Sequence, residues 1–354
     1  VIHYGDSITI TCRKHVAGQG TLRGRACGAS LERLQQAGCM TTTTAAKARS
    51  QVRSPASCVK TGTLACASRS GSGPEAPPTA AAAFPRMLRP VFCAGMDGLR
   101  VVFLGTGTSH GVPMIGCRCE VCTSPDPRDR RMRPSVALQW SERTVIVDTS
   151  PELRLQCLAG GITRVDAILY THAHADHVTG LDDLRRFNAL QKAVLPCYGS
   201  PDTLDVVLRM FPYAFTDDPL YPSAKPRLSL HPVQGPFALF GTPVVPIPLL
   251  HGSMPILGYR IGRFAYCTDC SDIPKASWPL LEGLDLLVLD ALRRRPHPTH
   301  MNLEQAIVAA TRIGARRTLF THIAHELLHG PVNAELPAGM ALAHDGLVAE
   351  ADAP

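Results

Sequence analysis

The segment THAHADH at residues 171–177 places three histidines and one aspartate within six positions. His172 and His174 alternate along the chain, so an extended turn would project both imidazoles in one direction. Asp176 and His177 follow where a helix is expected to begin. Such a turn can offer two imidazoles to one metal ion, and a carboxylate with an imidazole to a second. Nitrogen and carboxylate oxygen are ligands that suit zinc, and also manganese or iron.

A second group of metal-ligand residue types lies in GCRCEVC at residues 116–122. Cys117, Cys119 and Cys122 can supply three thiolates, and a closed tetrahedral zinc site then needs a fourth ligand. We expect that ligand to be His325, in the segment THIAH. A site with four protein ligands has no open position, so it would be structural. The alternative is a set of reduced, buried thiols.

The cysteine content also bears on the compartment. The chain has 13 cysteines, an odd number, and their spacing is irregular. This pattern disfavours the disulfide framework of a secreted protein and indicates a reducing compartment.

The H-x-H-x-D-H pattern directly after an expected strand resembles that of the metallo-β-lactamase-fold hydrolases. The resemblance extends over residues 99–349, where three later strand ends carry the segments LLHGS, YCTDCS and LFTHIAH. It implies one divalent ion held by three histidines and a second held by one aspartate and two histidines, with Asp269 bridging both. The first implied set is His172, His174 and His251, and the second is Asp176, His177 and His322.

The three cysteines, FLGTGTSHGVP before them and THIAH beyond them narrow the resemblance to the phosphoribosyl 1,2-cyclic phosphate phosphodiesterases of phosphonate breakdown. That branch carries a structural zinc beside a dinuclear centre, and the coenzyme PQQ biosynthesis protein B group has a similar cysteine arrangement. The resemblance implies hydrolysis of a phosphodiester, most simply a small cyclic or sugar phosphate. It also implies two catalytic zinc or manganese ions, which lower the pKa of a shared water so that a bridging hydroxide attacks.

Catalytic roles beyond metal binding are expected for Asp176 and His300. His300, in HPTHMNLEQA, is assigned as the proton donor to the leaving oxygen, because a histidine in the matching segment assists catalysis in that branch. The alternative is a solvent-exposed loop histidine. The roles of His297, which lies nearby, and of His110, in the glycine-rich loop at 105–113, are left open.

Three further segments are interpreted as support for the site. Asp148, at a strand end, is expected to accept a hydrogen bond from a ligand imidazole and so to fix its tautomer, a role compatible with capping a turn. Asp290 either makes a contact of the same kind or caps a helix. The run Arg293–Arg295 is interpreted as a solvated group of charges rather than an anion site.

The elements that must position these residues follow from the hydrophobic pattern. Helical spacing or helix ends are found at 177–192, 202–211 and 302–314. Strand patterns are found at 99–105, 135–140, 144–150, 165–171, 195–199, 285–291 and 316–322, and residues 257–269 have the pattern of a tight hairpin through Gly262. Strands that come first in meanders and later alternate with helices predict two packed sheets with helices outside. The resemblance specifies this α+β fold as an αβ/βα four-layer sandwich of two mostly mixed sheets.

Residues 1–95 differ in composition from the rest of the chain. They hold 12 of the 36 Lys and Arg residues but only 3 of the 29 Asp and Glu residues, with low-complexity runs such as TTTTAAKARS. We interpret them as a disordered leader or a non-native extension. The functional domain is then 96–354. We expect a cytoplasmic protein, although the Arg- and Ser-rich leader leaves organellar import open.

The charge balance beyond residue 95 restricts the class of partner. With the leader set aside, acidic residues slightly outnumber basic ones, so the broad positive field of a nucleic-acid-binding protein is missing. No run of about 18 apolar residues is present, so we expect no membrane association. We expect a small phosphodiester substrate, and leave both a monomer and a homodimer open.

Three rival functions remain on the same pattern of residues. The first is a tRNA 3′-processing-type nuclease, which shares the H-x-H-x-D-H core. The second is a non-hydrolytic protein similar to the PQQ biosynthesis B group. The third is hydrolysis of a β-lactam or a thioester.

Overall fold

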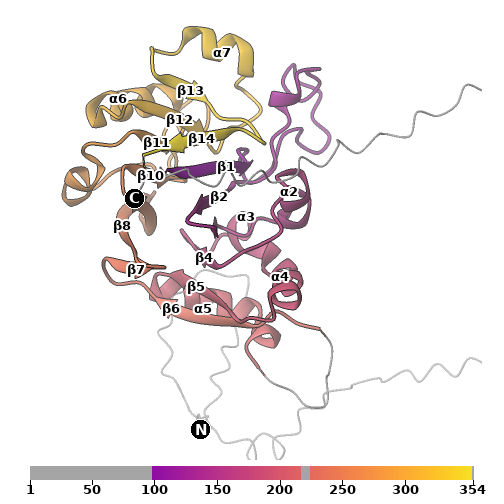
Figure 1. Ribbon diagram of the computed structural model, residues 1–354. Coiled ribbons are helices and arrows are strands. Elements are labelled where there is room, and N and C mark those ends of the chain that lie inside the picture. Colours follow the sequence, from indigo (N-terminus) through magenta and orange to yellow (C-terminus); the bar gives the residue numbers. More distant parts are fainter. Residues whose placement is uncertain (1–97, 217–223, 353–354) are drawn as a thin grey trace, which may run out of the picture. The chain divides into compact units, whose positions relative to one another are not determined.

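The computed structural model describes residues 98–216 and 224–352 (Figure 1). The leader expected at residues 1–95, and its proposed boundary at residue 96, lie outside this range. Among the described residues, the strands form two seven-stranded sheets. No helix in this part of the chain combines the length and the apolar character needed to cross a lipid bilayer.

The first sheet has the strand order β14-β1-β2-β3-β4-β5-β6. Its strands pair antiparallel from β14 to β3 and parallel from β3 to β6. The bounds are β1 (Leu99–Gly105), β2 (Ser135–Trp140), β3 (Arg143–Val147), β4 (Ala167–Leu169), β5 (Leu195–Gly199), β6 (Leu228–Pro232) and β14 (Val348–Ala351).

The second sheet has the order β13-β12-β11-β10-β9-β8-β7. Its strands are parallel from β13 to β10 and antiparallel from β10 to β7, so this sheet is mixed as well. The bounds are β7 (Phe237–Leu239), β8 (Thr242–His251), β9 (Met254–Ile261), β10 (Phe264–Cys267), β11 (Leu286–Asp290), β12 (Arg317–Thr321) and β13 (Met340–Leu342).

Alternate residues of the central strands enter different hydrophobic layers, because successive side chains of a strand point to opposite faces. Val101 and Phe103 of β1 pack with Val288 of β11 in the core between the two sheets. Val102 of β1 packs instead under the helices of the first sheet. Leu287 of β11 packs under the helices of the second sheet. Each sheet is therefore buried on both faces.

Helices cover the two outer faces, which completes the predicted αβ/βα four-layer arrangement (Figure 1). The first sheet is covered by α2 (Leu153–Ala159), α3 (Ala175–Val178), α4 (Leu184–Gln191) and α5 (Pro201–Met210). The second is covered by the 3₁₀ helix η4 (Lys275–Leu281), α6 (Leu303–Ile313) and α7 (His329–Glu335).

Helix α6 begins and ends as its sequence predicts. Asn302 accepts a hydrogen bond from the backbone N–H of Gln305, and the Gln305 side chain accepts one from the Asn302 N–H, which forms a capping box. Gly314 ends the helix with φ 68°, a left-handed conformation that glycine adopts without strain.

The single helix expected over residues 177–192 is wrong, because three short elements replace it. Helix α3 ends at Val178, the 3₁₀ helix η2 spans Thr179–Asp183, and α4 begins at Leu184. The cause is a backbone contact with the turn after β3: Thr149 N–H donates to His177 O at 2.7 Å, and Gly180 N–H donates to Thr149 O at 2.9 Å. These bonds replace the regular helical pattern and hold His177 against that turn.

Candidate metal centres

The predicted active-site ligands lie at or just after the ends of strands from both sheets. His172 and His174 follow β4, and His174 is the N-cap residue of α3. His251 is the last residue of β8, Asp269 lies two residues after β10, and His322 directly follows β12. The structure therefore brings residues separated by up to 150 positions in the chain to one edge of the sandwich.

Three of the turns at this edge pass through left-handed backbone conformations at residues other than glycine. The φ angles are 63° at Asp148, 56° at Asp269 and 59° at His322. Such conformations cost about 1–3 kcal/mol each and are commonly retained where they position functional side chains. Here they direct three buried polar side chains into one small region.

The first group consists of His172, His174 and His251, and one ring nitrogen from each lies within 4.8 Å of the others. His172 and His251 are buried, whereas His174 is exposed. His251 Nδ1 donates to the backbone carbonyl of Thr299 at 2.8 Å, so its Nε2 keeps a free lone pair. Burial is the main cause that lowers the pKa of His172 well below its usual value, and of His251 below its usual value. Both therefore stay neutral, as metal ligands must be.

The second group consists of Asp176, His177, Asp269 and His322, all buried and within the same 4.8 Å limit. His177 Nε2 lies 3.5 Å from Asp176 Oδ2 and 3.2 Å from Asp269 Oδ2. His322 Nε2 lies 3.6 Å from Asp176 Oδ2 and 3.1 Å from Asp269 Oδ1. Donor atoms at about 2.0–2.1 Å from one tetrahedral ion would lie about 3.3 Å apart, so these separations fit a shared cation.

Asp269 belongs to the second group and also lies near one member of the first, His251. Its two carboxylate oxygens point separately to His177 and His322, and a carboxylate oxygen also lies within 4.8 Å of a ring nitrogen of His251. Thr268 Oγ1 donates to Asp269 Oδ2 at 2.8 Å and helps to fix the carboxylate. This placement is the one that the resemblance implies for a bridging ligand.

Unpaired nitrogen atoms supply the test of whether these residues suit a metal. His172 Nε2, His177 Nε2 and His322 Nε2 are buried and have no hydrogen-bond partner in the structure. A buried polar atom without a partner is costly. Two of them, on His177 and His322, face carboxylate oxygens, and all three are explained if divalent cations accept their lone pairs, so the donor set fits divalent metals.

The electrostatics of the second group also favour a cation. Burial opposes the charged form of His177, yet Asp269, Asp148 and Asp176 together raise its pKa well above the usual value. At His322, burial again opposes the charged form, but Asp269 and Asp176 raise the pKa. The negative potential that would hold protons on these imidazoles is also one that attracts and stabilises a divalent ion.

Asp148 makes the contact expected of it. His177 Nδ1 donates to Asp148 Oδ2 at 2.7 Å, while Thr171 donates to the same carboxylate from its backbone N–H and its hydroxyl, each at 2.8 Å. Because the proton of His177 is held at Nδ1, the Nε2 lone pair faces the cluster. The Asp148 carboxylate therefore fixes this tautomer of His177.

His300, which could have been an ordinary exposed loop residue, instead lies in the wall of the cluster with only 9% of its side chain exposed. Its ring stacks on that of His322 with centroids 4.6 Å apart, and meets the His251 ring edge-on at the same distance. His300 Nδ1 lies 3.1 Å from Asp290 Oδ2. Burial, followed by the nearby His322, lowers the pKa of His300 to about 3.

Asp290 makes its hydrogen bond to His300 and not to an imidazole assigned as a metal ligand. One oxygen accepts from His300 Nδ1 and from the Met301 N–H, and the other lies 3.8 Å from His322 Nδ1. The predicted alternative, a helix N-cap, is filled by Asn302. Burial raises the pKa of the Asp290 carboxyl well above its usual value.

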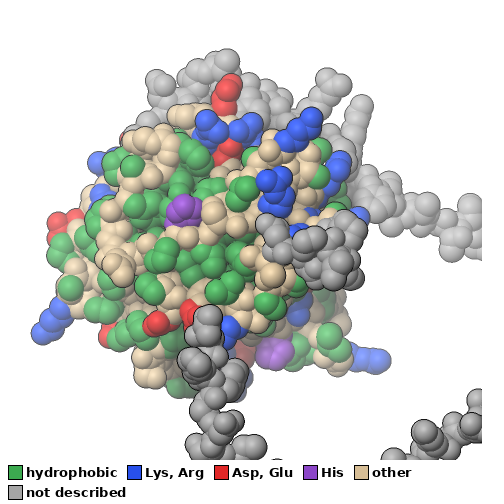
Figure 2. Space-filling view, turned by 90° about the horizontal axis from the view of Figure 1, so that it is seen from below, with side chains coloured by type: hydrophobic (Ala, Val, Ile, Leu, Met, Phe, Trp, Pro, Cys, Tyr) green, Lys and Arg blue, Asp and Glu red, His purple; other side chains and the backbone are tan. Residues whose placement is uncertain are grey.

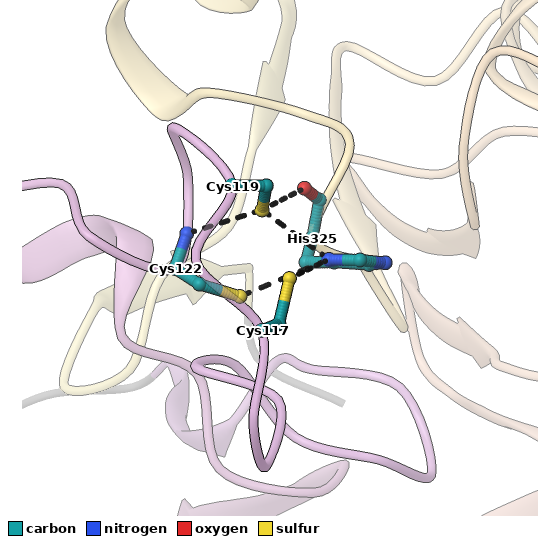
Figure 3. A group of neighbouring side chains, drawn as sticks. All are labelled: Cys117, Cys119, Cys122 and His325. Atoms are coloured by element: carbon teal, nitrogen blue, oxygen red, sulfur yellow. Dashed lines mark hydrogen bonds between the residues drawn. The ribbon is translucent and has the colours of Figure 1, made fainter.

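The predicted sulfur site is also assembled (Figure 3). His325 Nδ1 lies 3.2 Å from Cys117 Sγ, 3.3 Å from Cys119 Sγ and 3.7 Å from Cys122 Sγ. With zinc–sulfur bonds of about 2.3 Å and zinc–nitrogen bonds of about 2.0 Å, such atoms would lie about 3.5 Å apart. The four donor atoms all lie within 4.8 Å of one another, so the set fits a single tetrahedral ion.

Backbone groups support the thiolates. The N–H of Met114 donates to Cys122 Sγ at 3.3 Å, and the N–H of Cys122 donates to Cys119 Sγ at 3.5 Å. Burial opposes ionisation of Cys119, but the Cys122 N–H, Cys117 and His325 lower its pKa to about 6. Burial raises the pKa of Cys122 to about 11. All seven cysteines in the described part of the chain are free thiols, so no disulfide competes for these residues there.

Other candidates from the sequence take no part in either group. His110 is exposed. Arg294 pairs with Glu335, and Arg293 and Arg295 pair with Glu326, so the arginine run is a set of surface ion pairs, as interpreted. His297 is half-buried beside His300, with ring centroids 5.1 Å apart.

The sequence analysis missed a buried ion pair next to the sulfur site. Arg131 Nη2 lies 2.9 Å from Asp129 Oδ1, and neither side chain is more than 2% exposed. The segment DPRDRRMRP around them has the composition of a solvated loop. Only the proximity of Arg131 and Asp129 in sequence was available as a signal, and it does not indicate burial.

Comparisons with known proteins agree with this geometry. A family model described as "Beta-lactamase superfamily domain" matches residues 143–323, which is half of the chain. The chain therefore belongs to the beta-lactamase superfamily. A solved structure described as a new diphosphatase from the PhnP family is 46% identical, with a TM-score of 0.67, and the match covers 72% of this chain and 97% of that one. This similarity places the chain in the PhnP-like branch and confirms the fold and branch predicted from the sequence.

Two further proteins are similar to this chain, one in sequence and one in fold. A protein named octanoyltransferase from Porphyromonas gingivalis is 38% identical over 262 residues, a match that spans 72% of this chain but only 52% of that protein. The Zn(2+)-bound PqqB from Methylobacterium extorquens has the same fold, with 22% identity, a TM-score of 0.58 and coverage of 71% of this chain and 99% of that one.

Proposed function

We propose that this chain is a metal-dependent hydrolase that cleaves a phosphodiester, and that its substrate is a small cyclic or sugar phosphate. The observation that carries the proposal is the pair of donor groups with Asp269 near His251, His177 and His322, together with three buried imidazole nitrogens that have no partner. The identity of 46% to a PhnP-family diphosphatase supports chemistry at phosphorus rather than at a β-lactam or thioester.

The metal sites are assigned as the resemblance implies. His172, His174 and His251 would hold one zinc or manganese ion, and Asp269 would link it to the next. Asp176, His177 and His322 would hold the second ion. When bound, two such ions supply Lewis acidity that lowers the pKa of water and neutralises a phosphoryl oxygen. The Cys117–Cys119–Cys122–His325 group would hold a structural zinc.

His300 is proposed to protonate the leaving oxygen. His300 Nδ1 donates a hydrogen bond to Asp290, so His300 Nε2 is the nitrogen available to the substrate. An anionic phosphoryl group placed beside a buried neutral imidazole raises its pKa and favours loading it with a proton. That proton can then pass to the departing alkoxide, which is a poor leaving group unless it is protonated.

A second candidate is hydrolysis of a phosphoanhydride. It is favoured by the description of the 46% identical relative as a diphosphatase. A diphosphate and a phosphodiester both present an anionic phosphorus centre to the same donor groups. They differ in the leaving group, since a phosphate leaves far more easily than an alkoxide and depends less on His300.

The remaining rivals have less support. A nuclease requires a basic surface, whereas the sequence beyond residue 95 has a slight acidic excess. On the face shown in Figure 2, hydrophobic side chains occupy the centre and the Lys and Arg side chains lie toward the margin. A non-hydrolytic role like that of the PQQ group would not require the full set of seven donors that is retained here. The 38% identical relative is named an octanoyltransferase, but the match covers only 52% of that protein, so its name gives little support for acyl transfer by this chain.

The test is a substrate panel with the metal-replete full chain. It contains a ribose cyclic phosphate, bis(p-nitrophenyl) phosphate, a nucleoside diphosphate sugar and pre-tRNA, with Asp269→Ala as the control for contaminating activity. We expect the two phosphodiesters to be cleaved and pre-tRNA to be left intact. Turnover of the diphosphate alone would favour the second candidate. No turnover of any phosphodiester by protein with full metal content would refute the first.

A further inference from the structure

A fully buried arginine is bonded to the segment that carries ligands of both candidate metal centres. The side chain of Arg131 is 0% exposed and forms an ion pair with Asp129. Removing two charges from water is expensive, and a buried ion pair is often no more stabilising than apolar residues of the same volume. The pair therefore calls for an explanation other than stability of the fold.

Three hydrogen bonds of this pair are directed at one short segment, while Ser124 Oγ also donates to Asp129 Oδ2 at 2.7 Å. Arg131 Nη1 donates to the carbonyl of Ala324 at 3.2 Å, and Nη2 donates to the carbonyl of Leu327 at 2.7 Å. Asp129 accepts from the N–H of His329 at 2.8 Å. The guanidinium thus holds carbonyls on both sides of His325, and Asp129 holds the start of α7.

This segment connects the two centres directly. His322 belongs to the imidazole–carboxylate group, and His325 to the sulfur group, only three residues further along. Ile323, between them, bonds to the loop after β1: its N–H donates to Thr106 O at 2.8 Å. The backbone from 322 to 325 therefore has to satisfy two sets of ligand positions at once.

The backbone of Arg131 is tied to the other side of the sulfur site. Arg131 N–H donates to Val112 O at 2.7 Å, and Val112 N–H donates to Arg131 O at 2.8 Å. Val112 packs with Cys122 in the small hydrophobic cluster of the cysteine loop. A Cβ atom on Gly107 would come within 2.7 Å of Arg131 O, so the loop after β1 also depends on this position.

We propose that Arg131, oriented by Asp129, is a positioning residue for hydrolysis: its guanidinium holds the backbone at Ala324 and Leu327, so that His322 and His325 reach their separate metal ions together. The inference rests on the proposed function for its catalytic part. Its metal-binding part depends only on the contacts above. A lysine has a single nitrogen and cannot span the two carbonyls that the planar guanidinium holds.

The experiment uses full-length Arg131→Met and Arg131→Lys with cobalt(II) as the probe metal. Absorption of the cobalt–thiolate charge-transfer band reports the sulfur site, and the weaker ligand-field bands report the imidazole–carboxylate site. We expect both variants to bind cobalt at the imidazole–carboxylate site about 10- to 100-fold more weakly than the parent chain does. Arg131→Met should be affected more than Arg131→Lys. We also expect a changed thiolate spectrum and a fall in kcat with little change in KM.

The matched control is Arg260→Met. Arg260 also donates to backbone carbonyls, at 2.9 Å to Gly262 O and 2.7 Å to Leu280 O, but these carbonyls belong to neither metal group. We expect this variant to change the melting temperature without changing either cobalt spectrum.

The outcomes separate the two proposals. Unchanged cobalt affinities and spectra in Arg131→Lys, with only a lower melting temperature, would show that Arg131 is merely structural, even if Arg131→Met fails to fold. If the parent cleaved no phosphodiester, the proposed function would fail, but the cobalt comparison needs no substrate and would still decide the role of Arg131.

Discussion

The two candidate metal centres are built in opposite ways. The imidazole–carboxylate centre takes residues from strand ends in both sheets, and one of its histidines, His174, is exposed. The sulfur centre takes three residues from one short loop and a single distant histidine, His325. The imidazole–carboxylate centre offers more donors than one ion requires and lies beside His300. The sulfur centre has four donors, as many as one tetrahedral ion requires. The contrast indicates that an open centre for chemistry depends on the whole fold, while a closed centre fastens one loop to it.

The largest effect that would sharpen this contrast is expected for Asp269→Ala. Loss of the carboxylate that lies near donors of both groups should reduce phosphodiester turnover by about 10²–10³-fold or more, because two ions can no longer be held together. Metal analysis should show that the sulfur site keeps its zinc. Retained activity together with two bound ions at the first centre would contradict the bridging assignment.

His300→Ala should produce a loss that depends on the leaving group. Turnover of a ribose cyclic phosphate should fall by about 10²–10⁴-fold, because the departing alkoxide loses its proton donor. Bis(p-nitrophenyl) phosphate, whose leaving group needs no proton, should be affected much less. Metal content measured on the same sample provides the control. Equal losses on both substrates would argue against proton donation by His300.

Asp148→Asn tests a residue that orients a candidate metal ligand, His177, without being assigned as a ligand itself. An amide oxygen in the place of Oδ2 can still accept from His177 Nδ1 and from the Thr171 hydroxyl, but the amide NH2 would face the Thr171 backbone N–H, and the negative charge that orients the imidazole is lost. We expect metal affinity at this centre to fall by about 10- to 100-fold, as measured by titration with a competing chelator. Affinity equal to that of the parent chain would show that the tautomer is fixed by other contacts.

Cys119→Ser should have the smallest effect on chemistry and act mainly on stability. A structural zinc site can contribute up to about 10 kcal/mol to folding, so we expect a lower melting temperature and the loss of one zinc ion. At a temperature where the variant is folded, kcat should change less than in the three variants above. If zinc content and melting temperature both match the parent, the closed-site assignment is wrong.

The candidate metal ligands were predictable because ligand chemistry restricts both residue type and spacing. The cluster at 172–177 and the three cysteines identify themselves locally, and the resemblance supplied His251, Asp269 and His322. The structure brings each of them to its expected group. His325 was identified because three thiolates need a fourth ligand, which is a rule of coordination rather than of folding.

The parts that the sequence did not disclose depend on contacts between distant segments. His300 was ambiguous because only its packing against His322 and its contact with Asp290 separate it from an exposed loop histidine. Arg131 was missed because its acceptors lie almost 200 residues further along the chain. The break in the helix expected over 177–192 has the same origin, since it results from backbone bonds to Thr149 that no helical periodicity encodes.

The left-handed turns at Asp148, Asp269 and His322 imply a conflict for anyone who tries to make this protein more heat-resistant. Glycine at His322, whose ring nitrogens have no hydrogen bond to lose, would relax the backbone and should raise the melting temperature of metal-free protein, yet it would delete a side chain on which the open centre depends. Sequence optimisation guided by folding alone would therefore favour replacements that remove a side chain of the open metal centre. Selection for stability has to be combined with selection for metal binding at every round.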